Sequence, residues 1–505
     1  MIKLKRTSGV LLHLTSLPGP YGIGEIGPQA FNFVDDLADM KQKLWQILPD
    51  NPTDNYNCPY GAISAFANNS LLISFDYLLR DGWLDQNDLN EFPNTNSNQI
   101  SFEEIKNFRY PLLEKASQVF QIRKTNEDEK KFKNFCKKNK YWLENYALFI
   151  VLQKILKEEE WIRWPSSIKF REAKALNTII IKYKKEIKEE KILQYLYYSQ
   201  WSDLKNYANK KNIRIIGDIP IYVSFNSVDV WVNQKLFKLN EDGEMLVQSG
   251  CPPDFFISTG QIWGHPIYNW EEHKKNDYNW WLNRILFLFK KVDIIRVDHF
   301  NGFAKYWEIP SEDKNGLNGQ WVEGPGRELL DIIFKEIDGQ VILAEDLGEA
   351  YDEAKKLRNI FGIPGMKILQ FSFGDGKPLE NMDSNTVLYT GTHDNNTSLG
   401  WYNEKPGISN TDSIKNHIKS RNKAKIYLGL DESIEVPWSM IRYVMNSDAY
   451  FCIIPLQDIL GLDSSARMNT PGTIGDNWIW RYEKKSLNTT IKKQFKKITE
   501  DTNRI

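Results

Sequence analysis

Short runs of apolar residues, several of them rich in β-branched side chains, recur along this chain, and most are separated by segments with helical spacing. Each run has the length of a buried strand, and repeated strand-then-helix units indicate a parallel sheet. The runs cover residues 10–14, 44–48, 213–216, 292–297, 341–344, 367–371, 386–389 and 453–456. This pattern predicts an α/β protein with a closed (β/α)8 TIM barrel, whose active site is built at the carboxyl ends of the strands.

An open, doubly wound parallel sheet is the alternative that the same pattern allows. A nucleotide-binding sheet of that kind would need a Gly-rich phosphate loop after the first strand. Neither GxGxxG nor GxxxxGK occurs there, so the barrel is favoured.

The 505 residues are interpreted as one catalytic chain with inserted subdomains. The barrel core is expected at 1–50 and 206–505, and a mostly helical, heavily charged insertion at about 51–205, because no clear strand follows 44–48 until residue 213. A long, aromatic stretch predicts a loop subdomain at about 219–277. Helical spacing is clearest over 31–40, 141–160 and 278–290.

Composition narrows the classes of partner. The formal net charge is −1 and 26% of residues are charged, so nothing calls for nucleic acid or an anionic membrane surface. No run approaches the roughly 18 apolar residues of a membrane span. The four cysteines are far apart and follow no zinc or disulfide pattern. We therefore expect a reducing compartment, the cytoplasm, or the plastid stroma if a transit peptide has been removed.

The end of the fourth predicted strand carries three ionisable residues close together, Arg296, Asp298 and His299. Side chains alternate along a strand, so Arg296 and Asp298 point to the same side. An arginine beside an aspartate keeps the carboxylate ionised, which suits a nucleophile or a charge stabiliser. A structural ion pair at a strand end is the alternative. Other strand ends also carry acids, namely Asp218, Glu345 and Asp394.

Acids that converge on one cavity with arginine, histidine and aromatic side chains suit cleavage of a glycosidic bond. Asp298 is the better nucleophile because Arg296 would hold it ionised. Glu345 has a longer side chain and no basic neighbour in sequence, so it is the better general acid. Asp394 could stabilise the positive charge of the transition state. A Mg²⁺ site formed by the same acids is the rival interpretation, since no spacing excludes it.

A set of ordered motifs carries a resemblance to a known family. They are SGVLLHLTSLPGPYGIGEIG (8–27), LWQILP (44–49), GDIPIYVSFNSVDVW (217–231), GCPPDFF (250–256), TGQIWGHPIYNW (259–270), RVDHFNGF (296–303), AEDLG (344–348), THDNNT (392–397), ARMNTPGT (466–473) and NWIWR (477–481). This set resembles the 4-α-glucanotransferase (amylomaltase, disproportionating enzyme) family, a branch of the α-amylase superfamily.

The resemblance implies catalytic roles for Asp298 as nucleophile, Glu345 as general acid/base and Asp394 as transition-state stabiliser. It also implies substrate-binding positions, at Tyr60, Asp218, Trp263, Arg296, His299, His393 and Asn469. The implied fold is a TIM barrel with inserted subdomains and no C-terminal β-domain, and no metal or organic cofactor is expected.

The implied activity is retaining transfer of α-1,4-glucan segments from a malto-oligosaccharide donor to another glucan or to glucose as acceptor. The alternatives are an α-glucan hydrolase of the same superfamily and a non-catalytic glucan-binding barrel. Two departures from the family pattern are Asp50-Asn51, where the family usually has Leu-Gly, and Cys58, where it has Ser. They put acceptor preference and the role of position 58 in question, not the reaction class.

Overall fold

The structure is a computed structural model that describes residues 5–90, 98–253, 259–348, 350–374, 378–379, 382–404, 411–430 and 435–505. Its centre is an eight-stranded sheet in which every pairing is parallel, with the order β10-β11-β12-β1-β2-β3-β6-β9. The strands are β1 (Thr7–Leu11), β2 (Leu44–Gln46), β3 (Arg214–Pro220), β6 (Ile294–Asp298), β9 (Val341–Ala344), β10 (Gly365–Ile368), β11 (Thr386–Tyr389) and β12 (Phe451–Pro455).

The sheet curls into a nearly closed barrel. The backbone N–H of Ala344, at the end of β9, donates to the carbonyl oxygen of Pro364 beside β10 at 2.9 Å, so the two edge strands meet. Almost every strand residue is buried on both faces, as expected for a parallel sheet covered by helices. The predicted fold class is therefore confirmed.

The predicted strands are all present, with shifted bounds in places. β1 starts earlier than predicted, at Thr7, because Thr7 and Ser8 pair with β12 although both are polar. Leu14 lies beyond β1, in a short 3-10 turn. β10 ends at Ile368, where the chain passes into a 3-10 turn, Leu369–Phe373.

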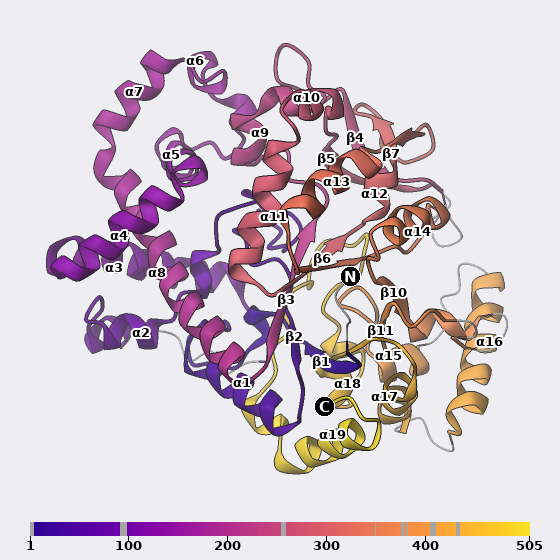
Figure 1. The fold of residues 1–505 in the computed structure, drawn as a ribbon. Helices are drawn as coiled ribbons and strands as arrows, with labels where there is room; N and C mark the ends of the chain where they lie inside the picture. Colours follow the sequence, from indigo (N-terminus) through magenta and orange to yellow (C-terminus); the bar gives the residue numbers. More distant parts are fainter. Residues whose placement is uncertain are drawn as a thin grey trace.

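Helices surround the barrel (Figure 1). They are α1 (Pro28–Asp39), α11 (Asn279–Lys291), α12 (Asn301–Ala304), α13 (Gly326–Glu336), α14 (Tyr351–Ile360), α15 (Ser398–Asn403), α16 (Thr411–Leu428), α17 (Val436–Asn446), α18 (Leu456–Ile459) and α19 (Thr489–Asp501). Beyond β12 the described residues contain helices and turns but no further strand. None of the described helices is both long enough and apolar enough to cross a membrane.

A helical region follows β2. It contains α2 (Phe75–Arg80), α3 (Phe102–Arg123), α4 (Asn126–Lys138), α5 (Lys140–Leu156), α6 (Ser166–Lys169), α7 (Ala173–Lys182) and α8 (Lys184–Lys210). The helix predicted at 141–160 ends at Leu156, because Lys157 takes a left-handed backbone conformation (φ 52°). α8 packs on α5 and α3 but also on α1 and α11 of the barrel. We propose α8 as the element shared by the barrel and the helical insertion.

The predicted loop subdomain at about 219–277 contains regular structure. After α9 (Val228–Val232), strands β4 (Val247–Cys251) and β5 (Gln261–Pro266) join β7 (Lys305–Pro310) and β8 (Gln320–Glu323) in a four-stranded antiparallel sheet, before α10 (Trp270–Lys275). This sheet was not predicted, because two of its strands, β4 and β5, precede β6 in sequence and the other two, β7 and β8, follow it. Residues 254–256 of the GCPPDFF motif lie outside the described residues.

Candidate active site

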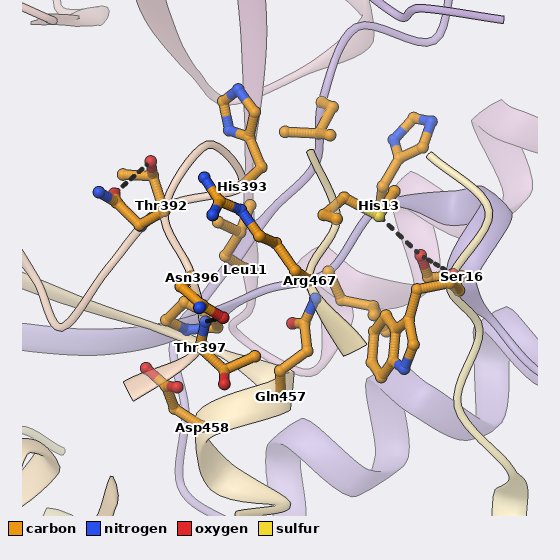
Figure 2. A pocket seen from close by; sticks show the side chains of 16 residues that line it. Leu11, His13, Ser16, Thr392, His393, Asn396, Thr397, Gln457, Asp458 and Arg467 are labelled. Atoms are coloured by element: carbon orange, nitrogen blue, oxygen red, sulfur yellow. Dashed lines mark hydrogen bonds between the residues drawn. The ribbon is translucent and has the colours of Figure 1, made fainter. Parts of the chain in front are cut away.

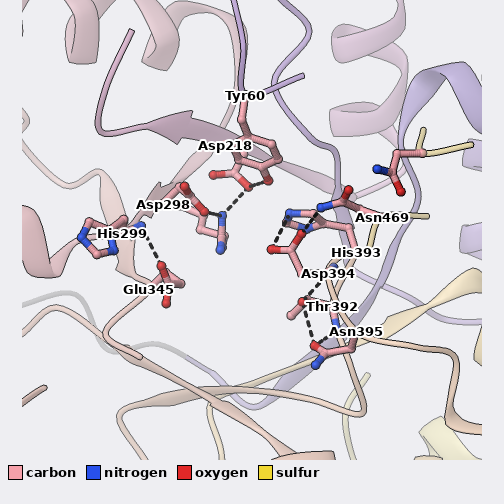
Figure 3. A network of polar contacts seen from close by, with 12 residues as sticks. Tyr60, Asp218, Asp298, His299, Glu345, Thr392, His393, Asp394, Asn395 and Asn469 are labelled. Atoms are coloured by element: carbon pink, nitrogen blue, oxygen red, sulfur yellow. Dashed lines mark hydrogen bonds and ion pairs between the residues drawn. The ribbon is translucent and has the colours of Figure 1, made fainter. Parts of the chain in front are cut away.

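β6 ends in a charged pair that faces the mouth of the barrel. Nη1 of Arg296 lies 3.0 Å from Oδ1 of Asp298, and 2.6 Å from Oδ2 of Asp218 on the neighbouring strand β3 (Figure 3). Arg296 and Asp218 are buried, whereas 26% of the Asp298 side chain is exposed. One guanidinium therefore faces two carboxylates, and only that of Asp298 reaches solvent to a sizeable extent.

Asp218 has a second partner in the Tyr60 hydroxyl, which donates to its Oδ2 at 2.8 Å. Burial raises the pKa of Asp218 to about 6, although the nearby Arg296 charge lowers it. Burial also raises the pKa of Tyr60, so its hydroxyl keeps its proton and stays a donor. These contacts fix Tyr60 against the floor of the site.

Glu345 follows β9 directly and accepts backbone hydrogen bonds rather than an ion pair. Its Oε2 accepts from the His299 N–H at 2.7 Å, and its Oε1 accepts from the Leu347 N–H at 3.2 Å. Burial, and next the negative charge of Asp298, raise the pKa of Glu345 to about 7. A carboxyl group with that pKa can both give and take a proton near neutral pH.

His299 turns the chain so that its N–H reaches Glu345. Its φ is 49°, a left-handed conformation that is uncommon for a residue other than glycine and that often marks functional sites. Its ring meets Trp263 of β5 edge-on, with centroids 4.8 Å apart. Burial lowers the pKa of His299, and lowers that of His265 on β5 to about 4. Both imidazoles are therefore neutral at pH 7.

Asp394 lies in the loop after β11 and faces the same opening, with 44% of its side chain exposed. Nδ2 of Asn469 donates to its Oδ1 at 2.6 Å, and Nε2 of His393 lies 3.3 Å from its Oδ2. Nη2 of Arg467 donates to the Asp394 backbone oxygen at 2.8 Å. Contacts from the 466–473 segment, together with His393 of the same loop, thus hold Asp394 in place.

Tyr60 contacts both the residues around Asp298 and the residues around Asp394. Its ring stacks on His393 with centroids 5.0 Å apart and planes 13° from parallel, and Trp478 lies 5.9 Å from His393. The same tyrosine donates to Asp218. The group around Asp394 is therefore in contact with the group around Asp298.

Below His393 lies a small cavity of about 20 Å³, lined in part by His13, Asp458 and Arg467 (Figure 2). Burial lowers the pKa of His13 to about 4. Oδ2 of Asp458 accepts from the Thr390 hydroxyl at 2.6 Å and from the Ser398 hydroxyl at 2.7 Å. These bonds pin both ends of the loop that carries Asp394.

The residues predicted for the site all lie in this one network around the barrel mouth: Asp298, Glu345, Asp394, Tyr60, Asp218, Trp263, Arg296, His299, His393 and Asn469. Their chemical roles stay predictions. Sequence reasoning did not single out His265, Arg467 or Trp478. Each belongs to a motif that carried the resemblance, but no local pattern showed which of its residues turn inward.

The carboxylates are not arranged as a metal cage. In the described parts of the chain, no group of three or more His, Cys, Asp or Glu side chains is placed to hold a metal ion. Each acid instead faces arginine, asparagine, tyrosine or backbone N–H groups. Those contacts leave the mouth lined with hydrogen-bonding groups and aromatic rings, which suits a polyhydroxylated substrate.

Comparison with known proteins agrees with this geometry. A family model described as 4-alpha-glucanotransferase matches residues 12–488. The chain is 40% identical to a 4-alpha-glucanotransferase of Synechocystis sp. over 98% of this chain and 97% of that one. It is 40% identical to the Arabidopsis thaliana 4-alpha-glucanotransferase DPE1, chloroplastic/amyloplastic, over 94% and 81%. The amylomaltase of Streptococcus agalactiae, solved in complex with acarbose, superposes with a TM-score of 0.92 at 37% identity and covers 99% of this chain and 100% of its own.

Proposed function

Because this chain belongs to the 4-α-glucanotransferase family and is an enzyme of that class, we propose that it works by a retaining mechanism with Asp298 as nucleophile and Glu345 as acid/base. The contrast between the two acids carries the proposal. Asp298 is paired with a buried guanidinium, whereas Glu345 is buried without a cation bonded to it and its pKa is raised to about 7. Such a division places a carboxylate paired with a cation beside a carboxyl group that can give and take a proton near neutral pH, as a retaining mechanism requires.

In the first step Asp298 attacks the anomeric carbon of the donor glucan, and the bond from that carbon to the glycosidic oxygen breaks. Glu345 gives its proton to the departing oxygen. The products are a glycosyl ester on Asp298 and a shortened glucan with a free 4-hydroxyl group. In the second step Glu345, now ionised, takes the proton from the 4-hydroxyl group of an acceptor, whose oxygen displaces Asp298.

Asp394 is placed to act on the sugar between these steps. Its partly exposed carboxylate faces the opening, while Asn469 and His393 fix its orientation. We assign it the stabilisation of the positive charge that develops on the ring, because a fixed carboxylate in a partly desolvated site acts without reorganising. Trp263 and Tyr60, together with His299, supply flat faces for sugar rings, and desolvation by them favours a glucan acceptor over water.

The substrates that we propose are malto-oligosaccharides and longer α-1,4-glucans, with glucose as the smallest acceptor. The complex of the Streptococcus agalactiae amylomaltase with acarbose supports a carbohydrate ligand for this fold. We also propose a reducing compartment, the cytoplasm or the plastid stroma. The cysteines form no disulfide in the described chain, and the Arabidopsis thaliana relative above is named chloroplastic/amyloplastic.

Incubation with maltotriose tests the reaction class. A ladder of longer oligomers together with glucose, without a steady gain in reducing ends, is the expected product. A steady gain in reducing ends instead identifies a hydrolase, and no reaction identifies a glucan-binding barrel.

The Asp298→Asn variant tests the nucleophile. We expect its rate to fall by several orders of magnitude, because the covalent step has no substitute. Asp331→Asn on the surface of α13 is the matched control and should transfer normally. In Glu345→Gln, α-maltosyl fluoride should form the glycosyl-enzyme without needing an acid, so mass spectrometry should find the sugar on the peptide that contains Asp298. Label on another peptide would refute the assignment.

A further inference from the structure

A large cavity, of about 710 Å³, lies between the helical insertion and the helices that follow β3 and β5. It is bordered by α5, by the turn after α6, and by α9, α10 and α11, which Figure 1 shows beside one another on one side of the barrel. Its lining residues are a different set from the ten of the active site. The volume is within the roughly 300–1,000 Å³ of small-molecule sites.

Amide side chains dominate the polar part of this cavity: Asn145, Asn233, Gln234, Asn276, Asn279 and Asn283. In each of these amides, hydrogen bonds within the described part of the protein use either the oxygen or the nitrogen, not both. Oδ1 of Asn145 accepts from Arg171 at 2.8 Å, and Nδ2 of Asn283 donates to Oδ1 of Asn279 at 2.9 Å. The opposite ends, Nδ2 of Asn145 and of Asn279 and Oδ1 of Asn283, are left for a ligand. The wall thus offers donors and acceptors together, as a polyol requires.

Aromatic rings form the remaining wall. Tyr141 and Phe170 are 46% and 42% exposed although both are large and apolar. Tyr141 meets the buried Phe66 edge-on at 5.7 Å, so its ring has a fixed orientation. Flat, partly exposed rings beside amide groups are the combination that binds sugars, because a pyranose has one apolar face and a rim of hydroxyl groups.

The cavity is also held rigid and has little negative charge. The Trp231 indole N–H donates to the Ile168 oxygen at 3.1 Å, and Nε2 of Gln234 donates to the Lys169 oxygen at 2.8 Å, which fixes the end of α6 next to Phe170. The acid in the wall, Asp229, is buried and accepts the Ala65 N–H at 2.7 Å. A neutral ligand therefore meets preformed groups and no exposed carboxylate.

The cavity and the active site share one loop. Ser64 and Phe66 line the cavity, and Tyr60, a few residues earlier, bonds Asp218 in the active site. We propose that this cavity is a second binding site for α-1,4-linked glucose chains, which holds long glucans on the enzyme away from the reacting bond. The choice of ligand rests on the function proposed above, since it is the same polymer.

Affinity electrophoresis through native gels containing amylose tests binding directly. All proteins carry Asp298→Asn so that the gel glucan is not consumed, and the barrel mouth contributes equally to each. Adding Tyr141→Ala and Phe170→Ala should weaken the amylose-dependent retardation by roughly 2- to 10-fold, the worth of losing aromatic contacts. Tyr198→Ala on α8, a residue 43% exposed outside this cavity, is the matched control and should migrate as the parent does.

Kinetics with otherwise wild-type protein separate this proposal from the proposed function. In the Tyr141→Ala/Phe170→Ala variant, kcat and KM for maltotriose should stay within about twofold, while KM for amylose rises by roughly 2- to 10-fold. Asn279→Trp, which fills the cavity without removing a ring, should likewise raise KM for amylose and leave kcat and KM for maltotriose within about twofold. If the wild-type protein does not transfer maltotriose, the proposed function fails, while the gels still report on the cavity.

Two results would overturn the second site. One is unchanged amylose retardation and KM in both cavity variants. The other would come from hydrogen exchange measured with each ligand added. If inorganic phosphate slows the exchange of backbone amides around Arg171 and maltoheptaose does not, the cavity is an anion site. Protection by maltoheptaose that Asn279→Trp abolishes is the expected result.

Discussion

The ionisation of Glu345 in the folded chain has a thermodynamic cost that can be measured through Glu345→Gln. Folding raises the pKa of this acid from 4.5 to about 7, through burial and the charge of Asp298. The folded chain therefore holds the proton more tightly than the unfolded chain does. The stability that this proton contributes is complete below about pH 4.5 and is lost as the pH rises through about 7. At pH 8 the accumulated loss is about 3 kcal/mol.

Glutamine is neutral at every pH, so the variant lacks this loss. It has one amide oxygen, and of the N–H groups of His299 and Leu347 that Glu345 now accepts, one loses its acceptor. That defect costs about 1–3 kcal/mol but does not depend on pH. The change in stability between two pH values therefore isolates the ionisation of Glu345.

Urea unfolding of both proteins at pH 5 and pH 8 is the assay. The free energy of unfolding of Glu345→Gln, relative to wild type, should rise by about 2.5 kcal/mol from pH 5 to pH 8. Glu336→Gln at the exposed end of α13 is the control and should show little change. An equal difference at both pH values would refute the reasoning, because Glu345 would then ionise alike in the folded and unfolded chains.

Three further predictions concern charge in the core. First, kcat/KM for maltotriose should fall above about pH 7, as Glu345 loses the proton it must give; a rate that is flat to pH 9 would contradict its role as the acid. Second, Arg296→Met should lower kcat/KM for maltotriose by roughly 10- to 100-fold, because the Asp298 carboxylate loses a charge-assisted hydrogen bond from the guanidinium. Arg296→Lys should lower it less, and an unchanged kcat/KM in the methionine variant would count against the ion pair. Third, Lys291→Met should lower the free energy of unfolding by roughly 3–5 kcal/mol, because it leaves the buried Asp50 carboxylate without its cation, 2.6 Å away. Asp50→Leu together with Lys291→Met should recover most of that loss in urea titrations, whereas a loss without recovery would locate the cost in packing instead.

The barrel could be predicted from sequence because its signal is local. Each strand is a short apolar run that needs no partner to be recognised, and 341–344 and 386–389 were predicted to the residue. The antiparallel sheet of β4, β5, β7 and β8 has no such signal. Its strands carry glycine, proline and polar residues, and β4 pairs with β7 about 60 residues away. Tertiary pairing decides that sheet, not local pattern.

In the candidate site, too, residues with a local sequence signal could be predicted, and residues placed by tertiary contacts could not. Acids at strand ends could be found from the strand pattern, since a parallel barrel brings those ends together. The partners that tune them could not, apart from Arg296 two residues from Asp298. Asp50 stood out in sequence only as a departure from a family pattern. Its contact with Lys291 spans 241 positions, and together with the Tyr197 hydroxyl it becomes visible only in the folded chain.

The difference between the two central acids follows from strand geometry itself. Arg296 and Asp298 lie two positions apart on β6, so alternation puts both side chains on one face, where they form an ion pair. Glu345 sits one position beyond the neighbouring strand β9, where the left-handed turn at His299 offers it a backbone N–H and no cation. The cation therefore comes with the strand of Asp298, the proposed nucleophile, whereas burial and the charge of Asp298 raise the pKa of Glu345, whose own strand supplies no cation. The spacing of Arg296 and Asp298 on one strand is thus the feature that gives the two acids different electrostatic surroundings.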